Sequence, residues 1–367
     1  MIAPSASLPS LVALGPAPTC DQPDPSRNGN GFHTRFADDL VALHTAGITD
    51  VRIGVDWARL QPRSGMGGDL NGEWVEFYSD VLTAAQRADV RVWFTLLERT
   101  VPQWFDDERG FVDPKTADRH WPRFVEAVAD ALGNRVAGWF PIDDPIGYAS
   151  RRLPDDAAQH GELVDTMVVA WRNAWRVLAG GPPMATSLGI RMVRPVDNTV
   201  PAAQAARREE HLRFTTFLRG LRDGNVVIPG RADRQLADLA GAVDVIGVKI
   251  RADLATDTAI DDESLRRWQE RATTLLHRVA EFGNDAPLVV SSFRASRTQR
   301  TENARDAEVL GEAFIRAVQA AAHDGIDITH VFGEPGVAAS KSTQEAALLD
   351  WDRHPTPLGE AWRALAG

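Results

Sequence analysis

Carboxylate and hydroxyl side chains stand at the ends of two apolar segments of this chain. Asp143 and Asp144 follow Trp139-Phe-Pro-Ile, and Ser292 ends the segment that begins at Pro287. A carboxyl group can donate or accept a proton in a reaction. A serine hydroxyl is a weak nucleophile without an adjacent base, and no histidine lies near Ser292 in the sequence. The first segment therefore offers acid–base chemistry, and the second offers only hydroxyl groups.

Two glutamates extend this set of carboxyl groups. Glu98 and Glu334 also come directly after apolar segments, so they are expected to face the same cleft as Asp143 and Asp144. Each glutamate also has a simpler interpretation as the ion-pair partner of a nearby cation such as Lys249, because buried charges are usually paired. For each glutamate considered separately, the role as an ion-pair partner is favoured over a role in catalysis.

The elements that must position these residues alternate along the whole chain. Short, continuously apolar segments are typical of parallel strands buried on both faces. They are Leu11–Gly15, Val51–Val55, Val90–Leu97, Val136–Ile142, Pro183–Leu188, Val243–Val248, Leu288–Ser291 and Ile328–Phe332. Helical periodicity is found over Phe36–Ala46, Trp74–Ala88, Trp121–Leu132, Leu163–Leu178, Ala205–Arg222, Leu265–Phe282, Glu308–Ala322 and Pro357–Leu365.

Eight strands, each followed by a helix, predict an α/β fold of the (β/α)8 TIM-barrel type. A doubly wound open sheet needs fewer strands and usually has a glycine-rich turn after the first one. Here Pro16-Ala-Pro-Thr follows the first strand. No internal boundary is evident, so residues 1–367 are predicted to form a single barrel domain. Active sites of such barrels lie at the carboxyl ends of the strands, where the carboxylates stand.

Composition excludes several classes of function. The net charge of −11 argues against nucleic-acid binding, which requires a basic face. The single cysteine, Cys20, excludes an internal disulfide framework, and the nine histidines form no metal-ligand pair, so neither a metal nor another cofactor is expected. No apolar run approaches the ~20 residues that cross a bilayer, and the first residues lack the pattern of a secretory signal. A soluble cytoplasmic protein that does not bind membranes is expected.

Several segments resemble family 1 glycoside hydrolases. Arg52-Ile-Gly-Val-Asp-Trp57-Ala-Arg59-Leu-Gln-Pro62 is similar to the second strand and loop of that family. Order and spacing hold over nearly the whole chain in the segments at Asn71, Phe77-Tyr78, Thr95-Leu96, Pro102-Gln103, Trp139–Pro145, Asp244–Ile250 and Pro287–Arg294. The resemblance implies a (β/α)8 barrel of the β-glucosidase type with a small sugar or glycoside as its partner. It leaves the oligomeric state open.

The same resemblance shows departures at the positions that carry the family's chemistry. The acid/base glutamate corresponds to Asp144 and the asparagine before it to Asp143, while the nucleophilic glutamate corresponds to Ser292. Three further changes place Glu98 at the histidine after the third strand, Lys249 at the sixth-strand asparagine and Glu334 at the eighth-strand tryptophan. Gln22 is in register with a sugar-binding glutamine, and Arg52 is the arginine that holds the nucleophile in the family.

These residues allow competing interpretations of their roles. Asp143 is expected to be a hydrogen-bonding partner, and Arg52 is expected to face Asp143 or an anionic ligand. Lys249 is expected to contact a ligand anion or to pair with Glu334. Trp104 is the best candidate for a sugar-stacking platform, although most tryptophans are explained more simply as core. Beyond the fifth strand, two further arginines line the mouth of the barrel or are simply solvated, namely Arg191 and Arg194.

Retaining glycosidases need two carboxyl groups about 5–5.5 Å apart, and Ser292 cannot supply one of them. The leading hypothesis is therefore a family 1-like barrel that has lost retaining β-glucosidase chemistry and binds a sugar-like or anionic ligand or a protein partner. The alternative is an O-glycosyl hydrolase of unusual mechanism with Asp144 as acid and Glu98 or Glu334 as its partner. A third hypothesis is elimination or isomerisation of a sugar derivative, with Lys249 or Glu98 as base. No feature of the sequence favours it over the other two.

Overall fold

The computed structural model describes residues 10–12, 31–64, 69–98, 100–153, 157–251, 260–283, 286–294, 304–334, 336–338 and 347–366. Within these residues, eight parallel strands form one sheet in the order β4-β3-β2-β1-β10-β9-β8-β5. They are β1 (Ser10–Val12), β2 (Asp50–Gly54), β3 (Arg91–Leu97), β4 (Gly138–Ile142), β5 (Leu188–Gly189), β8 (Ile246–Arg251), β9 (Leu288–Arg294) and β10 (Ile328–Gly333). The order around the sheet follows the order along the chain.

The two edges of this sheet meet between β4 and β5. Trp139 and Met184 form a parallel bridge there, and the amide of Asp144 donates to the carbonyl of Ser187 at 2.7 Å. The sheet is therefore closed, which confirms the predicted (β/α)8 barrel. The prediction of a single domain over residues 1–367 stays a prediction.

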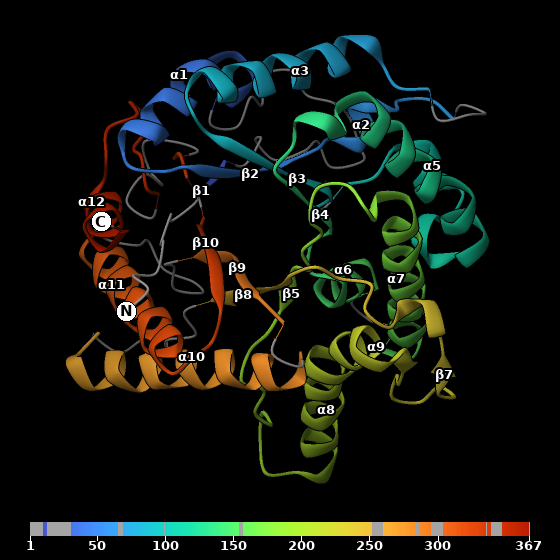
Figure 1. The fold of residues 1–367 in the computed structure, drawn as a ribbon. Coiled ribbons are helices and arrows are strands. Elements are labelled where there is room, and N and C mark those ends of the chain that lie inside the picture. The colour runs from blue at the N-terminus through green and yellow to red at the C-terminus, as the bar shows by residue number, and fades with distance from the viewer. Residues whose placement is uncertain are drawn as a thin grey trace.

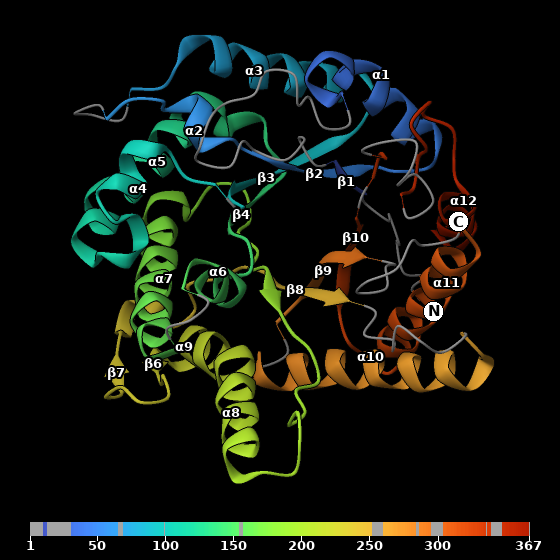
Figure 2. The same cartoon turned by 180° about the vertical axis from the view of Figure 1, so that it is seen from behind.

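Helices surround the strands as an outer ring (Figure 1), and the view from behind shows the same ring (Figure 2). They are α1 (Phe32–Thr45), α2 (Trp57–Leu60), α3 (Gly72–Arg87), α4 (Gln103–Asp107), α5 (Pro114–Leu132), α6 (Pro145–Arg152), α7 (Ala157–Leu178), α8 (Val200–His211), α9 (Phe217–Asp223), α10 (Asp262–Phe282), α11 (Ala304–His323) and α12 (Pro357–Ala366). A small antiparallel hairpin of β6 (Asn225–Val226) and β7 (Arg234–Gln235) follows α9. In the part of the chain that the structure describes, every helix is too short or too polar to span a bilayer.

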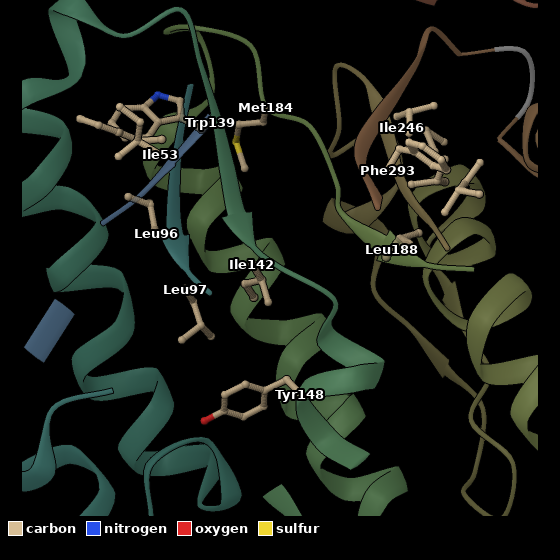
Figure 3. Packing of buried hydrophobic residues seen from close by; sticks show 14 of the residues in the cluster. Ile53, Leu96, Leu97, Trp139, Ile142, Tyr148, Met184, Leu188, Ile246 and Phe293 are labelled. Carbon is tan, nitrogen blue, oxygen red and sulfur yellow. The ribbon is translucent and has the colours of Figure 1, made fainter. Parts of the chain in front are cut away.

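The core has two layers because successive strand residues point to opposite faces of the sheet. The outer layer lies between strands and helices, and Figure 3 shows part of it, with Trp139 beside Met184. The inner layer fills the barrel. There Phe332 of β10 lies 5.6 Å from Phe140 of β4 and 6.3 Å from Trp93 of β3, measured between ring centroids. These strands are not neighbours in the sheet, so the rings meet across the barrel interior.

Candidate functional site

Arg52 lies at the centre of a polar layer above the aromatic rings of the barrel interior. Its guanidinium stacks over the Phe140 ring at 4.3 Å, and the residue is only 2% exposed. The guanidinium nitrogens donate hydrogen bonds to partners on other segments of the barrel. These are Thr95 Oγ1 at 2.7 Å, the Ser291 carbonyl at 2.7 Å, Ser187 Oγ at 3.3 Å and Asp143 Oδ1 at 2.6 Å. One side chain thus connects strands on opposite sides of the barrel.

Asp143 is held between two cations. Its Oδ1 accepts hydrogen bonds from Arg52 and from Ser187 Oγ, and its Oδ2 pairs with Lys249 Nζ at 2.6 Å. Burial alone would raise the pKa of Asp143, but Lys249 and Arg52 outweigh this effect and hold the pKa well below its usual range. Asp143 therefore remains a carboxylate and cannot donate a proton. Asp143 was one of the two partners expected for Arg52, and the structure shows this pair. The ion pair that the structure shows for Lys249 is also with Asp143, whereas Glu334 was the expected protein partner.

Asp144 begins α6 from a left-handed backbone conformation with φ of 45°. Its Oδ1 accepts hydrogen bonds from the amide of Gly147 at 3.0 Å and from the amide of Gly189 at 3.3 Å. A side chain at either glycine would collide with the carboxylate, since a Cβ at Gly189 would lie 2.6 Å from Oδ1. Arg151 Nη1 lies 4.0 Å from Oδ2. The structure thus places the Asp144 carboxylate as the cap of α6, and its role as an acid stays a prediction.

Glu98 lies directly over Gly54, where a Cβ would come within 2.5 Å of its Oε2. Glycine at the end of β2 therefore leaves the space that this carboxyl group occupies. Burial raises the pKa of Glu98, and the charges of Asp143 and Glu334 raise it further, against the opposing effect of Arg52 and Lys249. A raised pKa keeps the carboxyl group protonated to a higher pH, as a general acid requires.

A β-bulge in β9 brings two consecutive serines to the same side. The register between β8 and β9 shifts after Val248, so that Lys249 lies opposite Ser292. Ser291 Oγ lies 2.8 Å from Ser187 Oγ, and Ser292 Oγ donates a hydrogen bond to Glu334 Oε2. Bulges commonly change the direction of side chains beside functional sites. Here the bulge groups both hydroxyls with the polar layer and places Ser292 against a carboxylate.

The remaining predicted residues lie elsewhere. Trp104 Nε1 donates to the Gln61 carbonyl at 2.8 Å, and its ring packs edge-on against His120 and Trp57 at centroid distances of 5.0 and 6.5 Å. The structure thus places Trp104 in packing between α2, α4 and α5. Gln22 lies outside the described residues. The roles of both residues in ligand binding stay predictions.

Sequence reasoning missed Thr95, Ser187 and Ser291, which complete the polar layer. Their signal was weak, because each is a small polar residue inside or beside an otherwise apolar strand. Among the residues that the structure describes, no group of three or more histidine, cysteine, aspartate or glutamate side chains is arranged to hold a metal ion. The site is therefore built from carboxylates, hydroxyls and two fixed cations.

Comparison with known proteins identifies the family. The sequence model of glycosyl hydrolase family 1 matches residues 24–225, more than half of the chain. The chain belongs to glycosyl hydrolase family 1. This family 1 member is 26% identical over 258 residues to beta-glucosidase 5 of Oryza sativa subsp. japonica, covering 60% of this chain and 49% of that protein. It is 27% identical over 119 residues to beta-glucosidase 17 of Arabidopsis thaliana, covering 32% of this chain and 23% of that protein.

The chain thus spans about a quarter to a half of the length of these curated family 1 relatives. Among solved structures, the β-glycosidase from Pyrococcus horikoshii superimposes with a TM-score of 0.80 at 16% sequence identity, over 100% of this chain and 94% of that one. The structural likeness supports the same barrel fold in this family 1 protein.

Proposed function

We propose that this family 1 protein binds a sugar-like ligand or a glycoside at the carboxyl ends of its strands and does not use the retaining double displacement. The observation that carries the proposal is the environment of Ser292. This hydroxyl occupies the position that corresponds by resemblance to the family's nucleophile, and it donates its hydrogen bond to Glu334. An alcohol does not stabilise an adjacent positive anomeric centre with negative charge, whereas a carboxylate does.

The neighbouring carboxylates support this proposal. Asp143 is neutralised by Arg52 and Lys249, and the Asp144 carboxylate accepts backbone hydrogen bonds at the start of α6. A pair of carboxyl groups about 5–5.5 Å apart across a glycosidic bond is required for retention. Both aspartates make other contacts, which supports the proposal that they do not form such a pair.

A second candidate function is hydrolysis of an unusual O-glycoside with inversion, and the environment of Glu98 favours it. Glu98, whose pKa is raised, would give its proton to the leaving oxygen as the glycosidic bond breaks. Glu334 would take a proton from the water whose oxygen bonds to the anomeric carbon on the opposite face. The capping contacts of Asp144 favour Glu98 over Asp144 as the acid in this scheme.

The two candidates are separated by a panel of aryl α- and β-glycosides assayed with the wild type and with Ser292→Glu. If the retaining reaction is lost, the wild type should not hydrolyse aryl β-glucosides. Mass spectrometry of the wild type treated with a 2-deoxy-2-fluoroglycoside should then detect no glycosyl adduct on the chain. Such an adduct on the wild-type chain would contradict the proposal. Turnover of another glycoside that is abolished by Glu98→Gln and by Glu334→Gln, with an inverted product by NMR, would establish the second candidate.

A further inference from the structure

A separate cavity of about 400 Å³ lies outside the barrel wall, between β8, α10 and the segment that follows β5. Its floor is apolar and is formed by Ile250 of β8 with Trp268, Ala272 and Leu275 of α10, all of them buried. Lys249 reaches Asp143 inside the barrel. Because neighbouring strand residues point to opposite faces, Ile250 faces away from the barrel axis. The cavity is therefore distinct from the polar layer around Arg52.

The rim of this cavity is basic. Arg191, Arg194 and Arg271 line it together with one acidic residue, Glu209, which gives the lining a net charge of three minus one, or +2. This local excess stands out because the chain as a whole carries a net charge of −11. A basic rim around an apolar floor attracts a ligand of opposite charge.

The one acidic residue of the rim is already neutralised. Glu209 forms an ion pair with Arg191, and Arg213 Nε lies 2.9 Å from the same Oε1 atom. Arg194 and Arg271 form no ion pair with any residue that the structure describes. Two guanidinium groups thus remain available at the mouth of an apolar cavity.

We propose that this cavity binds a small amphipathic anion, with an apolar body on Trp268 and a carboxylate, sulfate or phosphate group between Arg194 and Arg271. The planar guanidinium fork matches the oxygen geometry of these anions and can bind them through two parallel hydrogen bonds. The volume lies within the range of roughly 300–1,000 Å³ that is usual for small-molecule sites. The ligand would sit outside the barrel wall and would not need to occupy the sugar cleft.

Isothermal titration calorimetry of the full chain with naphthalene-2-sulfonate tests this inference, with naphthalene-2-sulfonamide as the uncharged counterpart. We expect saturable 1:1 binding of the sulfonate and at least tenfold weaker binding of the sulfonamide. A charge-assisted hydrogen bond contributes enough for about a tenfold change, so Arg194→Ala combined with Arg271→Ala should weaken sulfonate binding by at least tenfold. Arg267→Ala is the matched control, because Arg267 lies on α10, pairs with Glu263 and does not line the cavity.

Ala272→Met provides a second test that leaves every arginine in place. Ala272 is buried in the floor, so a longer side chain would occupy the space for the apolar body. We expect this variant to lose sulfonate binding while its thermal unfolding still shows a folded protein. Equal affinity for the sulfonate and the sulfonamide, equal affinity of the double arginine variant and the wild type, or no binding of the sulfonate at millimolar concentration would each overturn the proposal.

Discussion

Asp143 and Glu98 lie at the same end of the barrel, and their surroundings shift their pKa values in opposite directions. Both carboxyl groups are taken out of water, which by itself raises a pKa. Asp143 is in direct contact with Arg52 and Lys249, so attraction outweighs burial. Glu98 has carboxylates among its strongest electrostatic neighbours, so repulsion adds to burial. The polar layer therefore contains one permanently ionised carboxylate and one carboxyl group that can hold a proton.

Replacement of Asp143 by asparagine should destabilise the protein strongly. Asp143→Asn leaves Arg52 and Lys249 as buried cations without their anion, and breaking a buried pair in this way typically costs about 3–5 kcal/mol. Urea unfolding at pH 7 measures this change. The pKa of Asp143 is lower in the folded protein than in the unfolded chain. Its contribution to the free energy of unfolding is therefore fully present above the ordinary aspartate pKa near ~3.9 and is lost as the pH falls below that value.

The difference between wild type and Asp143→Asn should accordingly shrink below that pH. Asp324→Asn is the matched control, since Asp324 is about half exposed and pairs only with His277 among the contacts described. It should change the free energy of unfolding by no more than ~0.5 kcal/mol. A similarly small effect of Asp143→Asn would show that the buried ion pairs contribute little.

Glu98→Gln should have the opposite effect on stability. The folded pKa of Glu98 is raised, so the wild type carries a penalty that appears as the pH rises from the ordinary glutamate pKa, near ~4.3, through the folded value. The glutamine variant lacks this penalty and should unfold at a higher temperature than the wild type at pH 8. The two melting temperatures should converge at pH 4. Glu76→Gln, on the exposed face of α3, serves as the control, and a variant less stable than wild type at pH 8 would contradict the prediction.

At the level of single elements, α6 depends on Asp144 for its first turn. Asparagine and aspartate tolerate the left-handed conformation and cap helices about equally well, whereas alanine does neither. Asp144→Ala should therefore lower the free energy of unfolding by about 1–2 kcal/mol, and Asp144→Asn should stay close to the wild type. Chemical unfolding of both variants measures this difference. Asp144→Asn also tests the catalytic role of this residue separately from its role as a cap, because a proton donor at this position would make any glycoside turnover disappear in a variant of wild-type stability.

The sequence predicted those elements that have a long hydrophobic pattern. β2, β3 and β10 lie within one or two residues of their predicted bounds, because strands buried on both faces are apolar throughout. The short helices α2 and α6 were missed, because their starts depend on single capping side chains, Asp56 and Asp144. The prediction of helical structure over Ala205–Arg222 was correct, but the sequence did not reveal the π-helical turn over Leu212–Thr216 that divides this segment into α8 and α9.

The candidate site was predictable at the level of residues but not at the level of contacts. The sequence offered Asp143 as one of two partners for Arg52, and the structure shows that pair. The sequence predicted that Lys249 contacts a ligand anion or forms an ion pair with Glu334, whereas the ion pair that the structure shows is with Asp143. Which strand-end side chains meet across a barrel depends on register. The β9 bulge that brings both serines together has no sequence signal as clear as a glycine or proline.

At the scale of the whole molecule, Arg52 links opposite walls of the barrel in the polar layer above the aromatic rings of the interior. Its own strand is β2, and its partners lie on β3, on β9 and on the segments that end β4 and lead into β5. Such a layer gives specificity through geometry, since every donor of the guanidinium fork needs an acceptor at the right place. The stability of the barrel should therefore depend on the shape of this side chain as well as on its charge.

Arg52→Met and Arg52→Lys separate shape from charge. Methionine leaves buried acceptors on several strands without a donor, so the free energy of unfolding should fall by at least ~3 kcal/mol, measured by urea denaturation at pH 7. Lysine keeps the charge but has no planar fork, and it should recover less than half of that loss. Arg267→Met, on the exposed side of α10, should change stability by no more than ~0.5 kcal/mol. If Arg52→Lys matched the wild type, charge alone would account for the role of this residue, and the link between the barrel walls would not depend on the guanidinium geometry.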